Sequence, residues 1–365
     1  MTVRDLARKC IRDIISYEPG KPIEELKREL GIKSVIKLAS NENPVGLSPK
    51  ALSAILKAAK NVNRYPDGNS FYLREKLSKF LGVGKNEIIF GNGSNEIIEF
   101  VVRAYLDAGE EVVISEPTFL IYKIVVAIQG GKSVIVPLKN FTYDLPAMKK
   151  AITPNTKIVF ISNPNNPTGT SVGRKEFEEF LKGLPRNVIV IVDEAYNEFV
   201  ERKDFPKALD YINKANVIVL RTFSKAHGLS GLRIGYGVAK PELIEYMEKV
   251  RQPFNINLLA QVAALASLED IKFIDGIRRL VLKEKHSIYN SLDKMGIDYV
   301  KSDTNFILIN VKRNSREVFN EMLKQGVIVR DMAAYDLKNY IRVTVGKKTE
   351  NERFIKILKK IVDSR

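Results

Sequence analysis

The chain of 365 residues carries 45% apolar and 28% charged side chains, a balance typical of folded globular proteins that excludes a disordered or fibrous one. Its length favours two domains, or one large α/β domain with an appendage. The net charge of +16 does not indicate a nucleic-acid-binding protein, because Lys and Arg are spread along the chain and alternate with Glu, as in EELKREL and RKEFEEFLKG.

The single cysteine, Cys10, excludes a disulfide framework and a cysteine-rich metal site. Apolar stretches such as VIVIVDEAYNEF are interrupted by charge before they could span a bilayer. The sequence shows no signal peptide. We therefore expect a cytoplasmic protein that binds no metal, membrane or nucleic acid.

Short strands alternate with segments of helical period from about residue 86 to 238. This pattern predicts an α/β fold with a mostly parallel sheet flanked by helices. Several of the predicted strands are continuously apolar, as strands buried on both faces are. The seven runs are EIIFG, EVVISEP, SVIVPL, KIVFISNP, VIVIVDEAY, VIVLRTFSK and RIGYGVA.

The two ends of the chain, residues 1 to about 40 and about 260 to 365, differ from this central α/β pattern. They are predicted to be mainly helical, with a few short strands such as NFILINV and YIRVTV. We predict that residues 41–258 form a large domain. Residues 1–40 and 259–365 are predicted to form one smaller α+β domain together.

Polar clusters follow the carboxyl ends of the predicted strands, at the edge where open α/β sheets bind ligands. The clusters are GNGSNE, EPTF, NPNNPTG, DEAY and TFSK. Lys225 in TFSK is the first candidate, because a lysine in a desolvated pocket has a lowered pKa and can form a Schiff base with a carbonyl compound. A lysine after a strand is more often a solvated surface residue, so its neighbours decide the interpretation.

Two groups of neighbours could bind an anion. Thr222, Ser224 and Arg233 place two hydroxyls and a guanidinium around one turn, a set that suits a phosphate. In GNGSNE, Ser94 or Asn95 is expected to cap a helix that begins near Glu96, whose exposed amides attract an anion. Taken alone, each of these turns could equally be a structural turn at the end of a strand, with no bound anion.

Asp193 ends the apolar run VIVIV, so its carboxylate needs a positive partner. A pyridinium nitrogen would meet that need, because an aspartate beside it keeps the ring protonated and electron-accepting. Tyr196 and Asn166 could donate hydrogen bonds to a phenolic oxygen on the same ring. The alternative for each is a structural cap or an Asx turn.

Spaced in this way, the segments NGSNE, PTF, NPNNPTG, DEAY and TFSKAHGLSGLRIG resemble the fold type I aminotransferases, which use pyridoxal 5′-phosphate (PLP). The resemblance covers nearly the whole chain. It implies that Lys225 holds PLP as a Schiff base and then acts as general base, and that Asp193 pairs with the pyridine nitrogen. Asn166 and Tyr196 would bond the ring oxygen. The phosphate would be bound by Ser94, Asn95, Thr222, Ser224 and Arg233.

Two aromatic residues complete the implied cofactor site. Phe119 falls where relatives place a ring-stacking aromatic residue, often Tyr. Tyr65 in RYPDG resembles the tyrosine that reaches the phosphate of the neighbouring subunit's cofactor, which implies a homodimer with shared sites. Asn95 departs from the family, since relatives often have an acidic residue at that position.

A narrower resemblance concerns ISYEPGKP and LASNENPVGLSP near the start, and GVIVRDM and YIRVTVG near the end. Together they are similar to histidinol-phosphate aminotransferases, which exchange an amino group between L-histidinol phosphate and 2-oxoglutarate. One of these substrates carries a phosphate and the other two carboxylates, and a guanidinium fork fits both groups. The implied substrate pocket contains Tyr17, Asn43, Tyr65, Asn166, Arg330 and Arg342.

The sequence leaves two alternatives open and argues against a third. A threonine-phosphate decarboxylase would use the same lysine and cofactor, and the choice depends on which substrate bond stands perpendicular to the ring. An aromatic or broad-specificity aminotransferase shares the cofactor site. A PLP-dependent transcription regulator would need a DNA-binding module, and about 40 N-terminal residues are too few for one.

Overall fold

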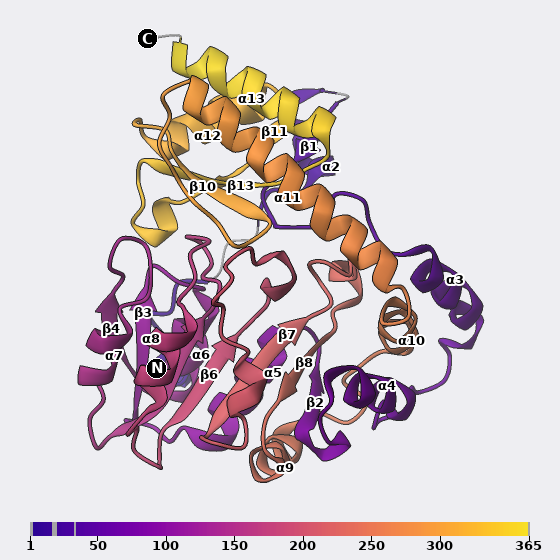
Figure 1. Ribbon diagram of the computed structural model, residues 1–365, viewed down its shortest axis with the longest axis vertical. Helices are drawn as coiled ribbons and strands as arrows, with labels where there is room; N and C mark the ends of the chain where they lie inside the picture. Colours follow the sequence, from indigo (N-terminus) through magenta and orange to yellow (C-terminus); the bar gives the residue numbers. More distant parts are fainter. Residues whose placement is uncertain (1–2, 17–19, 33, 364–365) are drawn as a thin grey trace.

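The computed structural model describes residues 3–16, 20–32 and 34–363. Figure 1 shows a large sheet surrounded by helices and, at one end of it, a smaller sheet beneath two long helices. Among the described residues, no helix is both long enough and apolar enough to cross a membrane.

The large sheet has seven strands in the order β2-β8-β7-β6-β5-β3-β4. Strands β4, β3, β5, β6 and β7 are parallel, and β8 runs antiparallel to both β7 and β2. All seven predicted strands are present, which confirms the predicted α/β fold. Their bounds are β2 (Ile88–Gly91), β3 (Glu111–Glu116), β4 (Lys132–Pro137), β5 (Thr156–Ser162), β6 (Ile189–Asp193), β7 (Val217–Thr222) and β8 (Gly235–Val238).

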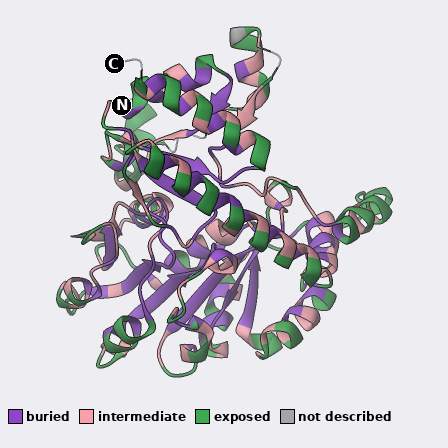
Figure 2. Cartoon of the chain, turned by 45° about the horizontal axis from the view of Figure 1, so that its top comes forward, coloured by how far each residue is buried: buried purple, intermediate pink, exposed green. Residues whose placement is uncertain are grey.

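Helices cover both faces of this sheet because alternate side chains of each strand point to opposite sides. In β5, Ile158 and Phe160 join the apolar core under α5 (Ser94–Tyr105), α6 (Ile121–Gln129) and α9 (Pro241–Val250). Val159 and Ile161 join the core on the other face. That face is covered by α3 (Pro49–Ala58), α4 (Phe71–Leu81), α7 (Leu145–Lys150), α8 (Arg174–Leu181) and α10 (Leu258–Ser267). Apart from the edge strand β4, the strands are therefore buried over most of their length (Figure 2).

The smaller sheet is antiparallel, in the order β12-β13-β10-β9. Its strands are β9 (Tyr299–Val300), β10 (Phe306–Asn310), β12 (Arg330–Asp331) and β13 (Tyr340–Thr344). It shares an apolar core with α11 (Ile271–Lys294), α12 (Ser315–Lys324) and α13 (Lys348–Asp363).

The N-terminal segment joins this part of the molecule through β1 (Ile36–Lys37), which pairs in parallel with β11 (Val327–Ile328). Two further helices precede it, α1 (Val3–Leu6) and α2 (Ile23–Leu30). α10 packs with α3 in the core of the large sheet, although the predicted boundary at residues 258 and 259 lies at its start. The division into domains stays a prediction.

Candidate active site

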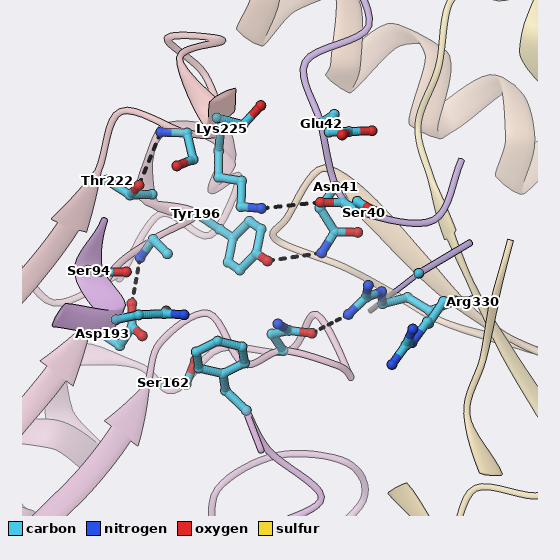
Figure 3. A pocket seen from close by; sticks show the side chains of 18 of the residues that line it. Ser40, Asn41, Glu42, Ser94, Ser162, Asp193, Tyr196, Thr222, Lys225 and Arg330 are labelled. Atoms are coloured by element: carbon cyan, nitrogen blue, oxygen red, sulfur yellow. Dashed lines mark hydrogen bonds between the residues drawn. The ribbon is translucent and has the colours of Figure 1, made fainter. Parts of the chain in front are cut away.

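A polar pocket lies where the carboxyl ends of β5, β6 and β7 meet the start of α5, as the positions of the polar clusters predict. Residues 39–42 and two arginines of the smaller sheet close it from the other side (Figure 3). Among the sequence-predicted residues, the pocket is lined by Ser94, Asn95, Phe119, Asn166, Asp193, Tyr196, Thr222, Ser224, Lys225, Arg233, Arg330 and Arg342.

Lys225 follows β7 by three residues, and its Nζ donates a hydrogen bond to Ser40 O at 3.3 Å. The same Nζ lies 5.6 Å from the centre of the Tyr196 ring. Burial, followed by the nearby charge of Arg342, lowers the pKa of Lys225 to about 8. About a tenth of the amine is therefore neutral and nucleophilic at pH 7, far more than for an ordinary lysine.

Asp193 is the last residue of β6 and is only 4% exposed. One carboxylate oxygen accepts the Tyr122 hydroxyl hydrogen at 2.7 Å, and the other accepts the Ala195 N–H at 3.1 Å. Burial raises the pKa of Asp193 above its usual range. Both of these donors are neutral, so the positive partner expected for this buried carboxylate stays a prediction.

The end of the pocket predicted to bind an anion is built around the first turn of α5. This helix begins at Ser94, with Gly93 as its N-cap, and neither Ser94 nor Asn95 caps it. The expected start near Glu96 was wrong, because Glu96 itself reaches back to accept the Asn92 N–H at 2.7 Å. The Ser94 and Asn95 side chains line the pocket instead.

Arg233 packs over this helix start. A Cβ atom at Gly93, whose φ is +81°, would lie 2.5 Å from Arg233 Nη2, so only glycine leaves room for the guanidinium. Arg233 Nη1 donates to Ser230 O at 3.1 Å, which holds the side chain over the helix terminus. Helix amides, hydroxyls and a guanidinium thus meet at one end of the pocket, a donor set that fits a phosphate.

The side chains expected to bond the oxygen of the cofactor ring are fixed by hydrogen bonds within the protein. Asn166 Oδ1 accepts from Arg342 Nη1 at 2.5 Å, and the Tyr196 hydroxyl accepts from Asn41 Nδ2 at 2.9 Å. Burial raises the pKa of Tyr196 to about 12, so the phenol stays protonated. Phe119 lines the pocket and contacts the Tyr122 ring edge-on, with centroids 5.6 Å apart.

The two arginines, twelve residues apart in the sequence, face each other across neighbouring antiparallel strands, since Arg330 of β12 is in register with Arg342 of β13. Arg342 is 6% exposed and its Nη2 donates to Ala39 O at 2.8 Å. Its buried Nε has no hydrogen-bond partner among the described residues. A buried guanidinium with donor capacity to spare is suited to an anionic ligand.

Two predicted substrate contacts, Asn43 and Tyr65, are not brought into this pocket. Asn43 does not line it, and instead donates to Ala226 O at 2.8 Å and accepts the Val45 N–H at 2.9 Å. Tyr65 is 84% exposed and stacks on Phe254, with ring centroids 4.9 Å apart. Tyr17 lies outside the described residues. Their roles stay predictions.

Sequence reasoning missed several residues of the pocket. Ser40, Asn41 and Glu42 line it, although LASNENP supplied only Asn43 as a candidate. Tyr122 was missed as the partner of Asp193; its position three residues after Phe119, at the start of a helix, is a signal that could have found it. Tyr335 also lines the pocket, and nothing in its local sequence marks it.

Lys225 is expected to react with a small aldehyde, trapped by borohydride reduction, with a half-maximum near pH 8, because burial keeps its amine neutral above that pH. Peptide mass spectrometry of the protein without PLP measures the labelling of each lysine. The exposed lysines, taken together, serve as the internal reference and should react fully only at higher pH. A Lys225 curve that coincides with theirs would show that the pocket does not desolvate this amine.

The chain matches the family Aminotransferase class I and II over residues 33–358. It is 47% identical to a histidinol-phosphate aminotransferase of Moorella thermoacetica, over 97% of this chain and 92% of that protein. A histidinol-phosphate aminotransferase 2 of Pseudomonas fluorescens is 45% identical, over 98% and 97% of the two chains.

Among solved structures, the histidinol-phosphate aminotransferase of Sinorhizobium meliloti in complex with pyridoxal-5′-phosphate superimposes with a TM-score of 0.90 at 28% identity, over 98% of this chain and 97% of that one. The agreement extends over nearly the whole of each chain, so it includes the pocket as well as the sheet. The chain therefore belongs to the family of class I and II aminotransferases and, within it, to the histidinol-phosphate aminotransferases.

Proposed function

We propose that this protein transfers an amino group between L-histidinol phosphate and 2-oxoglutarate with PLP as cofactor, giving imidazole acetol phosphate and L-glutamate in histidine biosynthesis. The observation that carries the substrate assignment is the pair Arg330 and Arg342, in register on neighbouring strands and facing Lys225 across one pocket. The names of the relatives support it.

The residues present fit PLP. Ser94, Asn95, Thr222, Ser224 and Arg233 would hold its phosphate at the start of α5. Asp193 would meet the ring nitrogen, Phe119 would lie against the ring, and Asn166 and Tyr196 would bond the ring oxygen. Once bound, PLP supplies the electron sink and carries the amino group between the two substrates.

Lys225 would hold the cofactor through its amine and, when a substrate amine takes that place, move the proton to and from the substrate Cα. A pKa of about 8 suits both tasks, because the amine is neutral often enough to accept a proton and acidic enough to return it. Tyr122 keeps Asp193 oriented toward the ring position through its 2.7 Å hydrogen bond.

The substrate anion would lie against the two arginines. A guanidinium binds a phosphate or a carboxylate with two parallel hydrogen bonds, so the same pair can accept histidinol phosphate and then 2-oxoglutarate. Tyr17 and Asn43 are proposed at the edge of this pocket on the resemblance alone.

The substrate assignment is tested by adding single amino donors to the PLP-loaded protein without a keto acid and recording its visible absorption. L-Histidinol phosphate should convert the cofactor to its amino form at far lower concentration than phenylalanine, aspartate or threonine phosphate do. Equal response to phenylalanine would indicate a broader aminotransferase. Release of CO₂ from threonine phosphate would indicate a decarboxylase.

Replacement of Arg342 by alanine should reduce kcat/KM in both half-reactions by about 10- to 100-fold, because each loses a charge-assisted hydrogen bond and Asn166 loses its partner. Single-turnover kinetics with each substrate measures this. Arg103→Ala is the matched control, since Arg103 is an exposed residue of α5 paired with Glu99. Loss confined to the 2-oxoglutarate half would contradict a shared anion pocket.

We further propose a homodimer in which Tyr65 reaches the cofactor phosphate of the partner subunit. Large apolar or aromatic side chains are exposed near Tyr65 in the sequence, as in interaction surfaces: Leu52, Leu56, Val62, Phe71 and Tyr72. If sites are shared, mixing and re-equilibrating Lys225→Ala and Tyr65→Ala proteins should restore about a quarter of wild-type activity, since half of the dimers then hold one intact site of two. Each variant measured alone is the control, and no recovery in a mixture that dimerises would rule out the shared site.

The cytoplasm is the proposed compartment, because the one cysteine implies no need for an oxidising environment. Fractionation of the source cells, followed by detection of the protein, tests this placement.

A further inference from the structure

Residues 39–41 contact three side chains of the pocket, each through a different residue. Ala39 O accepts from Arg342. Ser40 O accepts from Lys225, and Asn41 Nδ2 donates to the Tyr196 hydroxyl (Figure 3). The first two contacts use backbone carbonyls, which any residue supplies. Only the contact of Asn41 depends on its side chain.

Thr344 fixes the orientation of the Asn41 amide. The Thr344 hydroxyl accepts the Asn41 backbone N–H at 2.9 Å and donates its single hydrogen to Asn41 Oδ1 at 3.2 Å. Asn305 Nδ2 donates to Asn41 O at 3.1 Å, so the backbone is held as well. With Oδ1 turned toward Thr344, the amide must present Nδ2, a donor, to Tyr196.

A phenol has one hydrogen to donate and keeps it close to the ring plane, on one side of the oxygen or the other. Asn41 occupies one side of the Tyr196 oxygen as a donor, so the Tyr196 hydrogen must point to the other side. Tyr196 lines the pocket, and no described residue stands there as an acceptor of that hydrogen. The hydrogen is therefore available to a ligand.

We propose that Asn41 is a positioning residue, which holds Tyr196 as a hydrogen-bond donor toward the pocket. This inference rests on the proposed function, in which the acceptor is the ring oxygen of PLP. Asn41 acts only through Tyr196 and touches neither cofactor nor substrate in this account. Its 2% exposure and its φ of +55° show that the site is built around this residue, since asparagine tolerates this conformation better than most side chains.

Asn41→Gly is the cleanest variant, because glycine adopts a positive φ without strain and removes only the amide. The readout is the pH midpoint of the visible absorption of the PLP-loaded protein. A hydrogen bond donated to the ring oxygen favours its charged form, so weakening that bond should raise the midpoint. We expect a rise of about 0.5 pH unit in Asn41→Gly and a larger one in Tyr196→Phe.

The double variant separates positioning from a general structural effect. If Asn41 acts through Tyr196, Asn41→Gly should produce no further rise in the Tyr196→Phe protein. Equal rises in both backgrounds, or none in the wild-type background, would overturn the inference while leaving the role of Tyr196 intact. No rise in Tyr196→Phe itself would overturn the proposed role of Tyr196 and the inference with it.

Two further variants guard against misfolding. Asn351→Ala removes another buried asparagine amide, bonded to Glu284 and Gly346 away from the pocket, and should lower the melting temperature without moving the midpoint. If Asn41→Gly does not fold, Thr344→Val removes the hydroxyl that orients Asn41 and should raise the midpoint, whereas Thr344→Ser should preserve it. An unmoved midpoint in Thr344→Val would count against the inference.

Discussion

Burial of polar groups at the ends of continuously apolar strands is the constraint on which the site depends. Asp193 is the last residue of β6, and Thr222 is the last residue of β7, whose apolar residues are fully buried. Polar side chains in such places lose water and need partners from elsewhere in the chain. The same loss of water lowers the pKa of Lys225 and raises that of Asp193, so one physical cause prepares both groups for chemistry.

The smaller sheet supplies the two arginines that line the pocket opposite Lys225. The large sheet brings Lys225, Asp193 and the phosphate donors to one edge, but it contributes no guanidinium at the substrate side of the pocket. Arg330 and Arg342 come from β12 and β13, and segment 39–41 passes between these strands and Lys225. The region proposed to bind the substrate therefore lies between the apolar core of the large sheet and that of the smaller sheet.

Segment 39–41 is one of the links between these two parts of the molecule. Its carbonyls satisfy two cations, and its one amide side chain reaches the phenol above Lys225. The backbone of this segment is in turn bonded to Asn305 and Thr344. A displacement of the smaller sheet would therefore change the hydrogen bonds of Lys225, Arg342 and Tyr196 together.

The sequence by itself determined the seven strands, the edge that carries the pocket and most of the predicted residues that line it, because apolar runs and the polar clusters after them are local patterns. The separation of Arg330 and Arg342 by twelve residues was visible there as well. Only the tertiary structure decided that these arginines lie in register, that Tyr122 rather than a cation bonds Asp193, and that Asn41 rather than Asn43 lines the pocket. These facts depend on contacts between residues far apart in the chain, such as Asn41 with Thr344 and Tyr196, and no local pattern records such contacts.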